Sequence, residues 1–346
     1  SEVTFADGLS GTIFLGSNGA LAIRASMSVS GPAGAGPIAL SADSAPGADD
    51  ATTRVVEIDD GLAATAPEVS LFALTLRDGR ADSGGGGGLV AEGGARLVLD
   101  TLAIEDNHAE GPGGGLHAGP GAVVMLADTT LDGNSSADRG GGAHFGTQST
   151  VSVIFSRLTG NSAALDGGGA AFAGDSTVFL NSTTAALNSA GGDGGAVHVA
   201  DGGSVSISLS LLGDNAAEGR GGGLGTGAEV SLLVSGGEVS GNGSGLGGGG
   251  IFLDRESTAI LDEAFIHSNA VTGALQDGGG IHGPEDGSMV VLDSPILQNE
   301  ARNGAGILLP PGAGLRISDS RIAENAASGS GGGLFVETGG SVAAAR

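Results

Sequence analysis

The chain has 346 residues, of which 71 are Gly and 40 % are hydrophobic, and its formal net charge is −26. That charge argues against nucleic acid as a partner, because nucleic-acid binding relies on Lys and Arg that neutralise phosphates. The sequence contains no Cys, which excludes disulfides and thiolate metal sites. It also has no run of about 18 apolar residues, so no membrane-spanning helix is predicted.

The first 80 residues show only an irregular form of a repeat that runs through the rest of the chain. Val69 aligns with Leu97 and Leu76 with Ile104, and Gly79 then stands where the later repeats have Asn. Terminal repeats of solenoids are often atypical because they cap the core. We therefore interpret residues 1–80 as irregular N-terminal coils or a cap, and residues 81–346 as regular coils of the same continuous domain.

A repeat of about 27 residues fills the rest of the chain. Its clearest signal is a column of Asn residues, whose successive spacings are 27 six times, then 30, then 26. The nine members are Asn107, Asn134, Asn161, Asn188, Asn215, Asn242, Asn269, Asn299 and Asn325. The first residue after each Gly cluster recurs with a similar rhythm and is always Leu, Ile, Val or Ala.

Within a repeat, apolar residues alternate with mixed ones, and this period of two is typical of strands. The alternation occurs ten and eight residues before the Asn, again five and three residues before it, and once more after the Gly cluster. Each repeat therefore predicts three short strands, which become buried when repeats stack in parallel. The predicted fold is all-β: a single-stranded right-handed parallel β-helix, since parallel β connections are right-handed by default.

The repeated Asn and Gly residues have a structural interpretation. Asn amides stacked at successive bends can hydrogen-bond along the column and satisfy one another inside the solenoid. The sequence therefore predicts one structural ladder through all nine Asn residues. A Gly cluster allows positive φ and a close approach of two backbones at a tight corner.

These motifs resemble the repeats of secreted bacterial Gly-rich β-helix proteins, and in particular those of polymorphic outer-membrane proteins. That family carries GGA-hydrophobic and F-x-x-N tetrapeptides. The equivalents in this chain are GGAH and GGGI, and LTGN, IHSN and IAEN, with Leu or Ile in place of Phe. The resemblance implies an exported bacterial protein, extracellular or on the outer cell surface, often with an adhesive or structural role.

One acidic column is a candidate metal site. Glu263, Asp293 and Asp319 each lie six residues before an Asn of the column, so stacking places them roughly 5 Å apart on one face. Carboxylates that close repel unless a cation or Arg lies between them. The strip is thus either a calcium site, an enzyme's cation site, or a solvated acidic strip softened by Arg316 and Arg321.

A second column holds His117 and His144 in neighbouring coils, with His198 two coils further on. This position is expected to face outward. Two neighbouring imidazoles can share a transition metal, so the pair is an alternative metal site. The competing interpretation is a set of exposed residues on a parallel strand.

A third column, just before the Gly cluster, carries Arg139, Asp166, Asp193 and Arg220 in successive coils. It predicts two ion pairs between coils, Arg139 with Asp166 and Asp193 with Arg220. Exposed pairs of this kind contribute little, roughly 0–1 kcal/mol each.

The leading prediction is a non-catalytic structural or adhesive β-helix: a stiff spacer, an adhesin stalk or a subunit that assembles head to tail into filaments. Its partners are then other copies of itself or a cell-surface glycan or protein. No cofactor is required, and calcium is the candidate ion.

The alternatives are a polysaccharide lyase or hydrolase and a calcium-responsive glycan- or surface-binding module. The enzyme is less favoured because the chain has no Trp or Tyr and no Lys.

Overall fold

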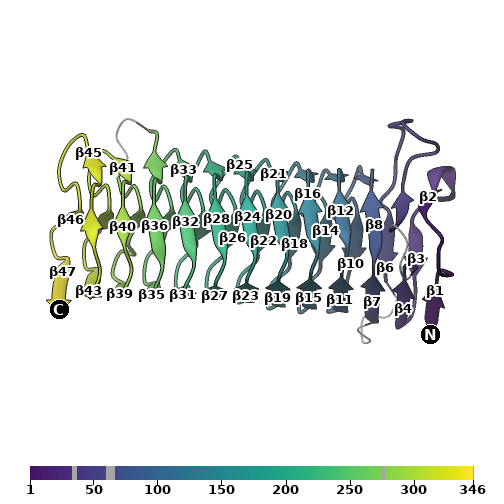
Figure 1. Ribbon diagram of the computed structural model, residues 1–346, viewed down its shortest axis with the longest axis horizontal. Coiled ribbons are helices and arrows are strands. Elements are labelled where there is room, and N and C mark those ends of the chain that lie inside the picture. The colour runs from purple at the N-terminus through teal and green to yellow at the C-terminus, as the bar shows by residue number, and fades with distance from the viewer. Residues whose placement is uncertain (33–36, 60–66, 274–276, 346) are drawn as a thin grey trace.

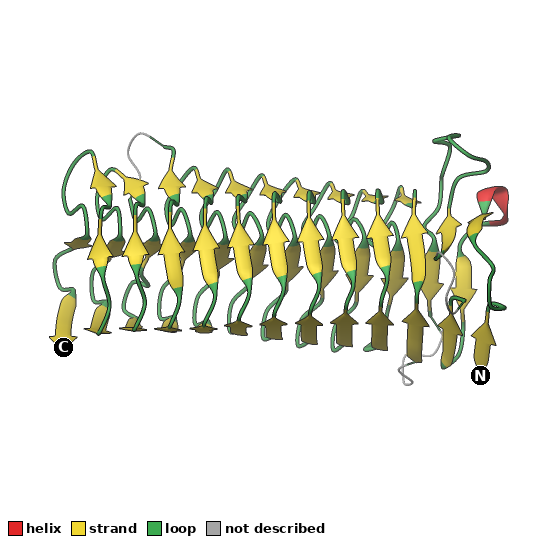
Figure 2. Cartoon of the chain, viewed as in Figure 1, coloured by secondary structure: helices red, strands yellow, loops and turns green. Residues whose placement is uncertain are grey.

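The computed structural model describes residues 1–32, 37–59, 67–273 and 277–345. The chain winds into one long stack of coils with its two termini at opposite ends (Figure 1). Almost all regular structure is strand, and the described residues include a single 3₁₀ helix, η1 (Gly16–Asn18), near the N-terminus (Figure 2). None of the described helical structure has the length and apolar character needed to cross a membrane.

Four parallel sheets, here named A to D, run along the stack with 13, 12, 12 and 10 strands respectively. Sheet A contains β1 (Glu2–Thr4), β4 (Met27–Ser30), β7 (Glu68–Phe72), β11 (Arg96–Asp100), β15 (Val123–Ala127), β19 (Thr150–Ile154), β23 (Thr177–Asn181), β27 (Ser204–Ser208), β31 (Ser231–Ser235), β35 (Thr258–Asp262), β39 (Ser288–Leu292), β43 (Gly314–Ser318) and β47 (Ser341–Ala345). Sheet B contains β2 (Gly11–Phe14), β5 (Ile38–Ser41), β8 (Leu74–Arg77), β12 (Ala103–Glu105), β16 (Thr130–Asp132), β20 (Arg157–Thr159), β24 (Thr184–Ala186), β28 (Leu211–Gly213), β32 (Glu238–Ser240), β36 (Phe265–His267), β40 (Ile296–Leu297) and β44 (Ile322–Ala323).

The other two sheets complete each coil. Sheet C contains β3 (Leu21–Ile23), β6 (Val56–Ile58), β10 (Leu89–Ala91), β14 (Leu116–Ala118), β18 (Ala143–Phe145), β22 (Ala170–Phe172), β26 (Val197–Val199), β30 (Leu224–Thr226), β34 (Ile251–Phe252), β38 (Ile281–His282), β42 (Ile307–Leu309) and β46 (Leu334–Val336). Sheet D contains β9 (Arg80–Ala81), β13 (His108–Ala109), β17 (Ser135–Ser136), β21 (Ser162–Ala163), β25 (Ser189–Ala190), β29 (Ala216–Ala217), β33 (Gly243–Ser244), β37 (Ala270–Val271), β41 (Glu300–Ala301) and β45 (Ala326–Ala327). A regular coil passes through the sheets in the order A, B, D, C.

The predicted parallel β-solenoid with about 27 residues per coil is confirmed, and the structure adds a fourth strand to the three predicted ones. The added strands form sheet D, and each is only two residues long in the regular coils, for example β13 and β17. Two residues are too few to show a period in the sequence. The second residue of such a strand faces inward, for example Ala109, which is fully buried.

Each regular coil turns four corners, and one residue in the left-handed conformation makes each of them. In the coil that begins with β11, these residues are Thr101, Asp106, Gly113 and Gly121, with φ between 54° and 76°. Three of the corners accept other residue types in other coils. The corner between sheets D and C is Gly in all ten coils from Gly86 to Gly331.

Gly140 shows why that corner accepts only Gly. Its φ is 68°, and a Cβ added there would lie 2.2 Å from the carbonyl oxygen of Ala143. The next residue, Gly141, meets a different restriction, because its Cβ would lie 2.4 Å from the carbonyl oxygen of Ser162 in the following coil. The Gly cluster therefore combines one left-handed corner with a close approach between stacked backbones.

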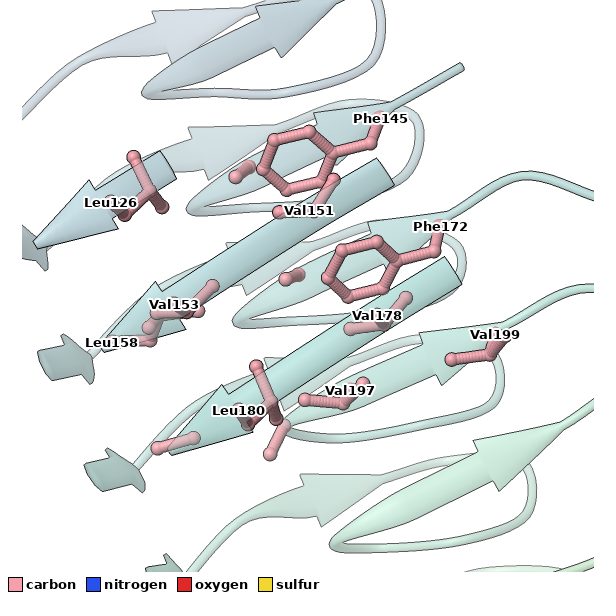
Figure 3. Packing of buried hydrophobic residues seen from close by; sticks show 14 of the residues in the cluster. Leu126, Phe145, Val151, Val153, Leu158, Phe172, Val178, Leu180, Val197 and Val199 are labelled. Carbon is pink, nitrogen blue, oxygen red and sulfur yellow. The ribbon is translucent and has the colours of Figure 1, made fainter. Parts of the chain in front are cut away.

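The interior is a set of apolar columns that run the length of the stack. Buried residues alternate with exposed ones along the strands of sheet A, as in β19, whose Val151 and Val153 point inward. Phe145 and Phe172 lie in neighbouring coils with their rings stacked, 5.0 Å between centroids (Figure 3). The first coils join the same columns, since Val69 pairs with Leu97 and Leu76 with Ile104 as the sequence alignment predicts.

The nine Asn residues of the column form one continuous hydrogen-bonded ladder. In each regular coil the side chain makes four bonds, which Asn188 illustrates. Its Nδ2 donates to Oδ1 of Asn215 at 3.0 Å and to the carbonyl oxygen of Leu158 at 2.8 Å. Its Oδ1 accepts from the backbone N–H and from Nδ2 of Asn161, both at 3.0 Å. The amide is therefore fully satisfied although Asn188 is only 1 % exposed.

We expect Asn188→Ala to lower the free energy of unfolding by about 2–4 kcal/mol, because two buried donors of Asn161 lose their acceptor. The measurement is the midpoint of urea unfolding. Asn181→Ala is the matched control: Asn181 is exposed at the end of β23, so the expected loss there is under about 0.5 kcal/mol. Equal losses in the two variants would contradict a stabilising ladder.

Candidate functional site

The outer face of sheet C carries a column of partly covered side chains along the rod, here named the groove. Its floor is the outward residue of each strand, and the column reads Val90, His117, His144, Ala171, His198, Gly225, Phe252, His282, Leu308 and Phe335. These side chains point outward from the sheet, as predicted, but they are not exposed. The four His residues of the column are half-buried, and several other members of the column are buried. The turn from sheet D to sheet C causes the burial. The backbone at Gly85 in one such turn approaches His117 so closely that a Cβ there would lie 2.8 Å from Cγ.

Every change in repeat length within the regular coils falls in that same turn. It spans seven positions from Ala109 to Leu116 in a regular coil. It is longer by three between β37 and β38, shorter by one between β41 and β42, and longer by one between β9 and β10. Solenoids place such variation on loops of one face, often the binding face. The turn borders the groove, so the groove is the candidate functional surface.

One described part of this groove, over β34, β38 and β42, is hollowed. It is a hollow of about 470 Å³ whose lining includes Arg220, Phe252, Asp254 and His282. The guanidinium of Arg220 lies 4.8 Å above the centre of the Phe252 ring, and the rings of Phe252 and His282 are 4.8 Å apart. The hollow thus presents an aromatic and cationic floor with a carboxylate beside it.

Further along the same column, His117 and His144 are in direct contact. Their Nδ1 atoms are 3.2 Å apart, and the rings are stacked at 5.1 Å between centroids with 10° between planes. His198 is separated from His144 by Ala171, as the spacing predicts. The structure therefore forms a pair of imidazoles and no row of three.

Burial lowers the pKa of both imidazoles. For His144 the pKa falls to about 3, because burial penalises the cation and the charges of His117 and Arg139 oppose it further. Burial also lowers the pKa of His117. The negative charge of Glu92 partly opposes this shift, and the positive charge of Arg54 adds to it. Both rings are therefore neutral at neutral pH and keep lone pairs available.

The acidic strip takes a different form. Glu263, Asp293 and Asp319 are exposed and occupy the left-handed corner between sheets A and B in three successive coils, with φ of 53°, 45° and 49°. Of the two arginines expected beside them, Arg321 instead pairs with Glu324 at 2.9 Å. Across the described part of the chain, no three acidic or His side chains gather closely enough to hold a metal ion. Calcium binding by the strip stays a prediction.

One of the two predicted ion pairs is present. Arg139 and Asp166 lie 3.0 Å apart. Asp193 does not meet the guanidinium of Arg220: its Oδ1 accepts the backbone N–H of Arg220 instead. The guanidinium is thereby free to lie over Phe252 in the hollow, and sequence spacing gives no signal for that contact.

The buried His144 makes stability depend on pH. Because its pKa in the folded protein lies below the ordinary value of 6.5, the unfolded chain binds the additional proton between these values, and stability falls as the pH drops below about 6.5. We expect wild-type protein to lose about 2–3 kcal/mol more than His144→Ala between pH 7 and pH 4.5, at about 1.4 kcal/mol per unit. Urea midpoints of both proteins across this range provide the measurement. The control is built into the fold, since Ala171 occupies the same position in the next coil, and parallel pH profiles would contradict the prediction.

In comparisons with known proteins, no family model, no curated protein and no solved structure matches this chain. The coils themselves identify it as a parallel β-solenoid repeat protein of about twelve turns.

Proposed function

We propose that the protein is a rigid, non-catalytic solenoid of the bacterial cell exterior with a structural or adhesive role. The observation that supports this most is the continuous Asn ladder, in which eight amide-to-amide bonds join Asn107 to Asn325. A ladder of this kind couples each coil to the next by side-chain as well as backbone bonds. A stack coupled in this way is stiff, which suits a role as a spacer.

The charge of the chain bears on its partners. A net charge of −26 favours solubility, and it makes divalent cations or basic partners the natural counter-charges. The bacterial origin and the export rest on the tetrapeptides GGAH, LTGN and IAEN alone. Head-to-tail assembly with other copies is part of the same structural proposal.

A second candidate function is adhesion to a cell-surface glycan through the groove over sheet C. The specific support is the coincidence of the length changes with the turn that borders the groove. The hollow also combines a carboxylate, an imidazole and an aromatic ring at Asp254, His282 and Phe252. Sugar recognition uses such polar groups to fix the orientation of the ligand.

The structural proposal is tested against its enzymatic alternative. In the first experiment, purified protein is incubated with uronate polymers, with and without calcium, and cleavage of the polymers is measured. In the second, an antibody against the solenoid is applied to intact and to permeabilised source cells. We expect intact polymers and labelling of intact cells. Cleavage that Asp293→Ala abolishes, or labelling only after permeabilisation, would overturn the proposal.

Adhesion through the groove has its own test. On an array of bacterial and host glycans, we expect wild-type protein to bind a subset and Asp254→Ala to lower that binding at least tenfold, because the carboxylate lines the hollow. Asp262→Ala is the matched control, eight residues further on at the end of β35 in sheet A. Equal binding by both variants, or no binding by the wild type, would exclude the groove as a glycan site.

A further inference from the structure

Of the two columns that the sequence marks as candidate metal sites, only one brings two ligand atoms together. The Nδ1 atoms of His117 and His144 lie 3.2 Å apart on neighbouring strands of sheet C. The carboxylates of the acidic strip belong to separate exposed corners. We propose that His117 and His144 form a binding site for a first-row transition-metal ion, Zn²⁺ or Cu²⁺, which joins two neighbouring coils.

The distance between the two nitrogens fits such an ion. Imidazole nitrogens bind zinc at about 2.0–2.1 Å, and two such ligands at a tetrahedral angle are about 3.3 Å apart. In the metal-free protein, one Nδ1–H donates to the other Nδ1 across the same gap. For an ion to bind, the donating ring changes tautomer: its proton leaves Nδ1 and, through solvent, a proton is taken up at Nε2. Each neutral ring then has its single proton on Nε2 and a lone pair on Nδ1 for the ion. Rotation of each ring about its Cβ–Cγ bond aims both lone pairs at one point, and the strands stay in place.

The surroundings determine what else the ion binds. The negative charge of Glu92 acts on His117, whereas the positive charges of Arg54 and Arg139 act on His117 and His144 respectively. In the described residues no third His, Asp or Glu completes a cluster. Water therefore fills the other coordination positions, and two imidazoles favour Zn²⁺ or Cu²⁺ over Ca²⁺ and Mg²⁺, which prefer oxygen ligands. The site is therefore distinct in chemistry from the calcium site predicted for the acidic strip.

The experiment titrates full-length protein with Zn²⁺, Cu²⁺ and Ca²⁺ separately by calorimetry. We expect one equivalent of Zn²⁺ or Cu²⁺ to bind, the thermal unfolding midpoint to rise with the ion, and a chelator to reverse the rise. His117→Ala and His144→Ala should each weaken this binding at least tenfold, while the response to Ca²⁺ is the same as in the wild type. As a folding control, each variant should show a cooperative thermal unfolding transition in the absence of metal.

His198→Ala is the matched control, because His198 shares the column and lies next to Ala171 and Gly225 rather than another His. It should bind the ion within about twofold of wild type. His267→Ala tests an imidazole outside the column, whose Nε2 lies 3.0 Å from a carboxylate oxygen of Glu238. The proposal is overturned if folded wild-type protein binds neither Zn²⁺ nor Cu²⁺, or if the His198 or His267 variant loses the binding that the His144 variant keeps.

Discussion

The constraint on which this structure depends is the pairing of amides at the corners. Each regular coil turns four times, and at every turn the backbone leaves the strands, for only two residues at the turns from sheet A to B and from B to D. At the corner between sheets B and D, the Asn column supplies the missing acceptor from the next coil, as Asn188 does for Asn161. At the corner between sheets A and B, Ser and Thr hydroxyls act similarly: the backbone N–H of Thr129 donates to Oγ of Ser156.

The same constraint explains why the repeat is visible in the sequence. A buried donor without an acceptor costs about 1–3 kcal/mol, so a coil that lost its Asn would disturb the coil before it as well. The Gly corner is restricted in a different way, since backbone carbonyls occupy the space around Gly140 and Gly141. Corners without such neighbours vary freely, and Leu187 and Leu209 are exposed in left-handed positions.

Most of the fold follows from the sequence because its signals are local and repeated. The Asn spacing and the alternation before it predict sheets A and B, and the alternation after the Gly cluster predicts sheet C; the register follows too, including the pairing of Val69 with Leu97. Sheet D is not predictable from a period, because its strands hold two residues. The depth of the groove is not predictable either. Spacing shows that His117 stacks on His144, whereas the burial of both depends on how closely the turn from D to C folds over them.

The ladder also sets how this rod can change in length. Because each amide must meet its equivalent in the next coil, a few residues added at most places would shift the column out of contact. The observed changes of one and three residues all lie between strands of sheets D and C, after one Asn and well before the next. Whole-coil duplication or deletion keeps every rung in place. The length of the rod therefore changes in steps of one coil, about 4.8 Å each. In the regular coils, insertions or deletions shorter than a coil are confined to the turns between sheets D and C.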